Sequence, residues 1–192
     1  MHKGRLEAFS DGVLAIVITI MVLELKIPHG ADPEDLRALW PVLLSYLMSF
    51  IYIGIYWNNH HHLMQAVHRV NGPVLWANLH LLFWLSLVPF ATAWMGENHF
   101  APWPVALYGG VLLAAACAYF ILTRALLSVE GCNSRLAMAL GRDRKGKFSV
   151  ALYALAIPLT QRSAWLACAI YAAVALIWLL PDRRIERVLG EG

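Results

Sequence analysis

The stretch RLEAFSDGVLAIVITIMVLEL, residues 5–25, decides the fold class of this chain. Its aliphatic run is almost unbroken and has about the 20-residue length that crosses the hydrocarbon core of a bilayer. Yet the stretch begins with Arg5, Ser10 and Asp11, and an ionised Asp inside hydrocarbon costs several kcal/mol. Because lipid cannot solvate Asp11, we expect this side chain to face other helices of the same protein.

The whole chain has the composition of a membrane protein. Of the 192 residues, 60% are hydrophobic and 14% are charged, whereas about a quarter of the residues of a soluble domain are charged. The eight Trp residues agree with this, because Trp collects at membrane interfaces. A net charge of +3 without a dense Lys and Arg run argues against a nucleic-acid partner. The three cysteines have no paired spacing, which argues against a zinc site or disulfides.

Six segments are predicted to form membrane-spanning helices in a single domain of residues 1–192. They lie at about 5–27, 38–62, 73–95, 103–127, 147–161 and 164–181. The last two are separated only by residues 161–163, which predicts a tight helical hairpin. Twelve of the 15 Lys and Arg residues fall in the termini and in the loops on the same side. This bias predicts an all-α integral membrane protein with both termini inside the cell.

The first predicted helix carries two different faces on a helical wheel. Ile16, Ile20 and Leu23 form one stripe with Thr19 beside it, at about 100° per residue. Asp11 points about 140° away from this stripe. The stripe has two interpretations: contact with lipid or a packed core, as for most transmembrane aliphatic residues, or the lining of a narrow pathway gated by dewetting. Periodicity alone does not separate them.

The first residues of this helix resemble the signature of a known channel family. Arg5, Phe9, Ser10 and Asp11 form the pattern Arg-x-x-x-Phe-Ser-Asp, which resembles that of the endosomal/lysosomal potassium channel family, also called the transmembrane protein 175 family. Residues 12–16 and 22–28 are similar to its prokaryotic branch. With the helix count and the length, the resemblance covers essentially the whole chain.

This resemblance implies a homotetramer of six-helix subunits in which helix one of each subunit lines a central pore. It implies a potassium-permeable, modestly selective cation channel in the cell membrane of a prokaryote, with no enzymatic activity and no cofactor. The filter of the family is a set of aliphatic rings rather than a carbonyl loop. By position these rings are Ile16, Ile20 and Leu23, with Thr19 beside them. Glu24 is expected at an acidic outer mouth that concentrates cations, although an ordinary solvated loop is an alternative.

Polar side chains of the second and third predicted helices form another candidate set. Its members are Trp57, Asn58, His60, His61, Asn78 and His80. Three adjacent histidines at 60–62 sweep around a helix instead of sharing one face, so their spacing does not favour a metal site. We expect Ser10 and Asp11 to hydrogen-bond with this set and hold helices one, two and three together. Interfacial snorkelling and pH sensing by histidine remain alternatives.

Two other functions stay open on the sequence alone. A proton-permeable or proton-coupled transporter is the main alternative, but it favours carboxylates at mid-membrane, and Asp11 lies near one helix end. A membrane enzyme would need a nucleophile or a metal-ligand set facing one pocket. The predicted partners are therefore potassium and other monovalent cations, the lipid bilayer, and further copies of the chain.

Overall fold

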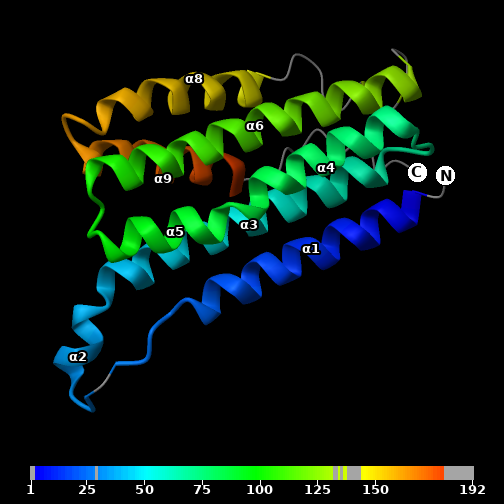
Figure 1. The fold of residues 1–192 in the computed structure, drawn as a ribbon. Helices are drawn as coiled ribbons and strands as arrows, with labels where there is room; N and C mark the ends of the chain where they lie inside the picture. Colours follow the sequence, from blue (N-terminus) through cyan, green and yellow to red (C-terminus); the bar gives the residue numbers. More distant parts are fainter. Residues whose placement is uncertain (1–2, 29, 132–133, 135, 138–143, 180–192) are drawn as a thin grey trace.

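The computed structural model describes residues 3–28, 30–131, 134, 136–137 and 144–179 of the chain. Within this part of the chain the structure is all helical, and the long helices run side by side as one bundle (Figure 1). The helices are α1 (Lys3–Leu23), α2 (Pro33–Ala38), α3 (Trp40–Gln65), α4 (Gly72–Ser86), α5 (Val88–Glu97), α6 (Pro102–Glu130), α8 (Arg144–Leu159) and α9 (Ala164–Leu179).

Four helical stretches among the described residues are long and apolar enough to cross a membrane. They are Lys3–Leu23, Trp40–Gln65, Gly72–Glu97 and Pro102–Glu130. Helices α8 and α9 have 16 residues each, fewer than the ~20 that usually span the hydrocarbon core. These two helices correspond to the predicted segments 147–161 and 164–181, of which residues 180–181 lie outside the described part.

Prolines account for the main differences from the predicted helix boundaries. The third predicted helix, 73–95, is two helices that meet at Leu87, because Pro89 lacks an N–H and its ring clashes with the preceding turn. The second predicted helix, 38–62, starts at Trp40 and extends to Gln65. The short helix α2 precedes it, and Leu39 ends α2 just before the Trp40-Pro41 start of α3.

The packing of the helices places α1 at one edge of the subunit. Helix α1 packs against α3, α4 and α5, whereas α6 packs against α4, α5, α8 and α9. In Figure 1, α1 runs along one edge of the bundle and α8 along the opposite edge. The face of α1 that is turned away from these neighbours is therefore open to whatever surrounds the subunit.

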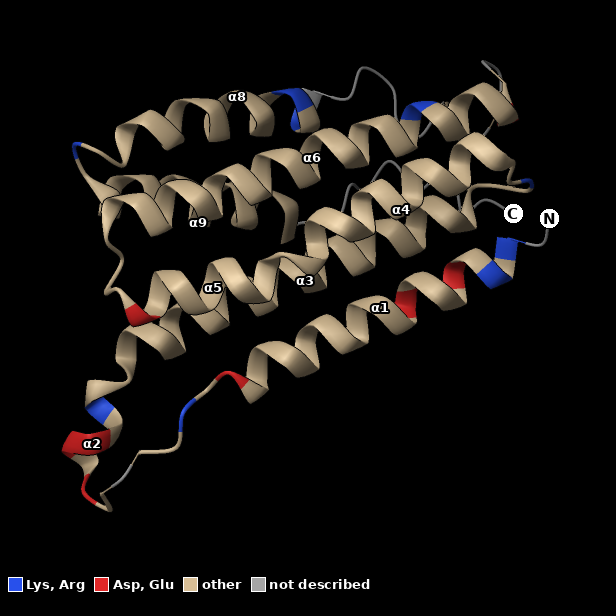
Figure 2. Ribbon diagram, viewed as in Figure 1, with Lys and Arg blue, Asp and Glu red and all other residues tan. Residues whose placement is uncertain are grey.

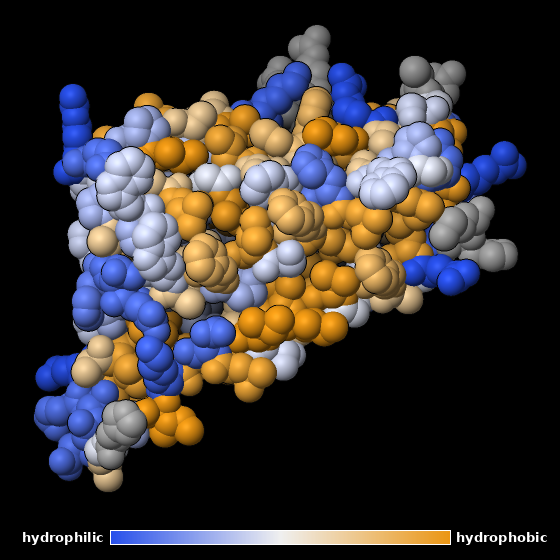
Figure 3. All heavy atoms as spheres, in the orientation of Figure 1, coloured by the Kyte–Doolittle hydropathy of each residue, from blue (hydrophilic) through white to orange (hydrophobic). Residues whose placement is uncertain are grey.

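Charged and apolar residues are separated along the bundle. Lys, Arg, Asp and Glu gather towards the ends of the long helices, and the middle of the bundle is almost free of them (Figure 2). The same face of the molecule carries a broad apolar surface between hydrophilic ends (Figure 3). This is the distribution that a bilayer favours, because charges are costly in hydrocarbon and well solvated at its borders.

Candidate functional site

The stripe predicted to line a pathway lies on the open face of α1. The exposed fractions of Ile16, Ile20 and Leu23 are 59%, 42% and 76%. Thr19 lies on the same face, and its hydroxyl donates a hydrogen bond to the Ala15 carbonyl oxygen at 2.9 Å. A single subunit therefore exposes a row of large branched side chains along α1. Such an exposed apolar surface is typical of a face that contacts lipid or another protein chain.

The opposite face of α1 is buried against its own subunit. Its members follow the spacing of three and four residues that one side of a helix requires. They are Leu6, Ser10, Leu14, Val17 and Met21. All but one are apolar, and the exception, Ser10, is completely buried. A buried hydroxyl needs hydrogen-bond partners, and those of Ser10 come from α1 itself and from α4.

A directed chain of hydrogen bonds joins α3, α4 and α1 through Ser10. The Ser10 hydroxyl donates to the Leu6 carbonyl oxygen at 2.8 Å and accepts from the Asn78 amide nitrogen at 2.9 Å. The Asn78 amide oxygen then faces His60 Nε2 at 2.9 Å, which makes this ring nitrogen the donor. His60, Asn78 and Ser10 are 2%, 1% and 0% exposed. We call Ser10, His60 and Asn78 the buried triad.

Asp11 belongs to a second, more exposed row of contacts between α1 and α3. The Trp57 indole N–H donates to an Asp11 carboxylate oxygen at 3.1 Å. One turn nearer the start of α1, Glu7 lies 3.3 Å from Nδ1 of His61, and Trp57 stacks on His61 with ring centroids 6.1 Å apart. Asp11 therefore faces α3 and not the open face that carries Ile16.

Not every predicted member joins these contacts. His80 accepts a hydrogen bond from Trp84, four residues away on α4, at 3.0 Å. The prediction that His80 joins a network with α1 is therefore wrong, because a residue of its own helix is its partner. Arg5 and Phe9 are exposed, and Asn58 is half-buried. None of these three contributes a side-chain hydrogen bond to the buried triad or to the Asp11 row.

Sequence reasoning missed two residues near the start of α1. The Lys3 ammonium donates to the carbonyl oxygens of Met64 and Val67 at 2.9 and 3.0 Å, at the end of α3, where helix carbonyls lack partners and a cation is favoured. Glu7 precedes Asp11 by one turn and so shares its face, a signal that could have identified it. The sequence offers no comparable signal for Lys3, since its partners are backbone atoms of another helix.

The charged groups beyond the other end of α1 are exposed. Glu24 is exposed, as a mouth position requires, but the next basic residue, Lys26, donates to the Glu97 carboxylate at 2.5 Å. The side chains of Lys26 and Glu97 are 75% and 49% exposed. This hydrogen bond raises the pKa of Lys26 above its ordinary value. The acidic character expected at this end is therefore partly neutralised by Lys26.

Metal-binding geometry is not found in the described part of the chain. No group of three or more His, Cys, Asp or Glu side chains lies close enough together there to hold an ion. The histidines at 60–62 point in different directions: His60 bonds to α4, and His61 lies beside α1.

Comparisons with known proteins agree on one family. The model of the family described as endosomal/lysosomal potassium channel TMEM175 matches residues 5–89. A potassium channel of Chryseobacterium sp. (strain P1-3) is 56% identical over 191 residues, which cover 100% of both chains. The mouse (Mus musculus) endosomal/lysosomal proton channel TMEM175 is 32% identical over 103 residues, which are 47% of this chain and 21% of the mouse protein.

A solved structure has the same fold. It is the crystal structure of a lysosomal potassium-selective channel TMEM175 homologue from Chamaesiphon minutus, with a TM-score of 0.79 and 33% sequence identity. The match covers 94% of this chain and 97% of that chain, so it extends well beyond residues 5–89, which the family model matches.

Proposed function

Because the chain belongs to the TMEM175 family, whose members are ion channels and not enzymes, we propose that it is a potassium-permeable cation channel of modest selectivity. The observation that carries the proposal is the 56% identity to a potassium channel over the full length of both chains. We place the protein in the cell membrane of a prokaryote, with potassium as the permeant ion and no cofactor.

The proposed assembly is a homotetramer in which each α1 faces a central axis. The uncovered face of α1 supports this arrangement, because four copies would bury Ile16, Ile20 and Leu23 against one another around that axis. Helices α8 and α9 complete six membrane passages as a short hairpin at the edge away from α1, where the bilayer thins to match them, with both termini inside the cell. The excess of Lys and Arg on that side supports the orientation.

The proposed filter is hydrophobic. Four Ile16 side chains form the tightest ring, and Ile20 and Leu23 form wider rings towards the outer end. Rings of apolar side chains exclude water until they widen, so movement of α1 opens the path to a partly hydrated cation. Potassium passes more easily than sodium because its hydration shell is less costly to deform. Selectivity stays modest since no cage of carbonyl oxygens replaces that shell.

The buried triad has the proposed role of holding this filter in place. Its hydrogen bonds join α1 to α3 and α4 at Ser10, less than two turns before Ile16. Asp11 supports the same joint through Trp57. The carboxylate of Asp11 then helps to attach α1 to α3, and it is not a group that ions meet in the pathway.

Substitution of Ile16 by Asn tests the filter. We expect Ile16→Asn channels in liposomes to conduct but to lose most of their preference for potassium over sodium, because an amide ring holds water. Val22→Asn is the matched control, since Val22 is also exposed on α1 but lies about 120° away on the wheel. An unchanged potassium-to-sodium flux ratio in Ile16→Asn would overturn the assignment of the filter.

A proton pathway is the second candidate function. It is favoured by the mouse relative, which is named a proton channel, and by the carboxylates of Glu7 and Asp11 beside His61 and Trp57. Liposomes loaded with a pH indicator separate the two functions. A potassium gradient that changes the internal pH only after a protonophore is added supports the potassium channel. A pH change that needs a potassium ionophore but no protonophore supports the alternative.

A further inference from the structure

The subunit contains a cavity of about 460 Å³ between α3, α6, α8 and α9, within the ~300–1,000 Å³ range of pockets that bind small molecules. We propose that this cavity binds one acyl chain of an anionic phospholipid of the surrounding bilayer, with the headgroup against Lys147. No residue of α1 lines it. The inference requires that the bundle lie in a membrane, but it does not require that α1 conduct ions.

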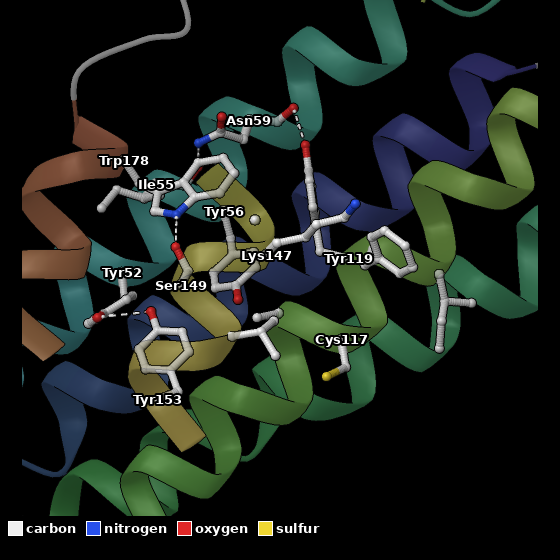
Figure 4. A pocket seen from close by; sticks show the side chains of 15 residues that line it. Tyr52, Ile55, Tyr56, Asn59, Cys117, Tyr119, Lys147, Ser149, Tyr153 and Trp178 are labelled. Atoms are coloured by element: carbon white, nitrogen blue, oxygen red, sulfur yellow. Dashed lines mark hydrogen bonds between the residues drawn. The ribbon is translucent and has the colours of Figure 1, made fainter. Parts of the chain in front are cut away.

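The wall of the cavity offers an apolar surface because its polar atoms are largely paired with one another. The pairs are Trp178 Nε1 to Ser149 Oγ at 2.8 Å, the Tyr119 hydroxyl to the Asn59 carbonyl oxygen at 3.2 Å, and the Tyr153 hydroxyl to the Tyr52 hydroxyl at 3.1 Å (Figure 4). A cavity lined in this way holds water poorly and favours an apolar occupant. A hydrocarbon chain is the apolar group that a membrane supplies in excess.

The cavity opens at the surface of the subunit between α6 and α8. Phe120 and Ile121 of α6 line it and are 37% and 46% exposed, and Cys117 beside them is exposed as well. In a membrane-crossing bundle an apolar opening at this position faces lipid tails and not water. A chain can therefore enter sideways from the bilayer.

Charge at the rim indicates an anionic headgroup. Lys147 lines the cavity, is exposed and lies in the first turn of α8, within the sequence RKGK at 144–147. Lysine near a helix end keeps its ammonium at the membrane border while its stem lies on apolar surface, and basic residues there attract anionic lipids. The Tyr56 hydroxyl, which also lines the cavity, has no hydrogen-bond partner among the described residues and can donate to an ester carbonyl of the lipid.

Photolabelling of the full chain in liposomes tests the site. The probe is phosphatidylglycerol with a diazirine on one acyl chain, and the matched probe is phosphatidylcholine with the same chain. We expect mass spectrometry to place the crosslinks on α6 and α8 at the cavity, around Cys117, Phe120 and Val150, with phosphatidylglycerol labelling more strongly. Labelling spread evenly over all lipid-facing helices would overturn the proposal.

Two pairs of variants distinguish the cavity from its surroundings. Val150→Trp fills the cavity and should abolish labelling there, whereas Leu155→Trp, at an exposed position of α8 that does not line it, should not. Lys147→Gln should reduce the preference for phosphatidylglycerol about fivefold, the factor expected for one basic residue near a membrane surface. Arg162→Gln, in the turn between α8 and α9, should leave it unchanged.

The remaining outcomes assign a different occupant or none. Equal labelling by both phospholipids overturns the headgroup assignment. Labelling by a free fatty acid with the same diazirine, but not by phosphatidylglycerol, overturns the phospholipid source. Because Lys147→Gln changes an exposed side chain, the result does not depend on whether Val150→Trp folds. Potassium flux in the same liposomes is a separate readout, so failure of the filter and failure of the lipid site are distinguishable.

Discussion

Both faces of α1 are largely apolar, and they differ in where the hydrogen-bonded polar group lies. The face turned into the subunit carries the buried hydroxyl of Ser10 among apolar side chains, and the open face carries Ile16, Ile20 and Leu23. In water the branched side chains would be buried first. In a membrane the polar group must be inside, because hydrocarbon cannot hydrogen-bond with it.

The residues that attach α1 to its subunit are therefore different from the residues that α1 exposes on its open face. The buried triad fixes the helix to α3 and α4 through hydrogen bonds that no solvent can replace. The open face makes no such bonds across the subunit, so its residues can change without loosening the bundle. Variants of the two faces should therefore affect different properties, stability on one side and ion flux on the other.

Asn78→Ala should cause the largest loss of stability. It removes the donor to Ser10 and the acceptor for His60. Ser10 keeps its hydrogen bond to the Leu6 carbonyl oxygen, but Nε2 of His60 is left buried and unpaired, at a cost of about 1–3 kcal/mol. The melting temperature of the purified protein in detergent measures this loss. Leu79→Ala, at a neighbouring position that is 42% exposed, is the control.

Ile16→Ala should change the potassium-to-sodium flux ratio, with a much smaller shift in melting temperature than that of Asn78→Ala. An equal shift in melting temperature would contradict the separation of the two faces.

Trp57→Phe should have an intermediate effect. The ring is kept, but the N–H that donates to Asp11 at 3.1 Å is lost, which costs about 0.5–1.5 kcal/mol for a partly exposed hydrogen bond. Asp11→Asn is the companion variant, since its amide oxygen can still accept from Trp57. The melting temperature should be highest for wild type, lower for Asp11→Asn and lowest for Trp57→Phe. A loss as large as that of Asn78→Ala would place Asp11, and not the buried triad, at the centre of the joint.

Glu97→Gln should have the smallest effect. It breaks the ion pair with Lys26 beyond the C-terminal end of α1, and exposed pairs contribute little. Because Glu97 raises the pKa of Lys26 above 10.5, the contribution is complete below that pH and is lost as the pH rises through the raised pKa. Melting temperatures of wild type and Glu97→Gln should thus differ slightly at neutral pH and converge in strong alkali. Glu34→Gln in α2 is the control, and a gap that widens with pH would contradict this origin.

The sequence predicted the character of α1 well, for a physical reason. A helix repeats its faces every few residues, so the wheel separates Asp11 from Ile16 without knowledge of any neighbour. Polar groups inside membrane helices need partners, which is why Ser10, His60 and Asn78 could be placed in one set. In the structure, hydrogen bonds link His60 to Asn78 and Asn78 to Ser10.

What the sequence did not predict depends on how helices cross and where they break. A wheel gives the direction of His80 but not its depth against α1, and Trp84 one turn away takes its hydrogen bond instead. Lys3 pairs with backbone oxygens whose position depends on the end of α3. Pro89 carried a readable signal for the break at Leu87, but the predicted helix 73–95 ran through it.

The position of the buried triad has a mechanical consequence. The hydrogen bonds of Lys3, Ser10 and Asp11 attach α1 to its neighbours in its first half, so a swing of α1 that keeps these bonds has its pivot near Ser10. At about 1.5 Å per residue, Ile16 lies ~9 Å beyond the pivot and Leu23 ~20 Å. A given swing of α1 therefore displaces Leu23 about twice as far as Ile16. In the proposed assembly, the ring of Ile16 would therefore widen about half as much as the ring of Leu23 for the same swing.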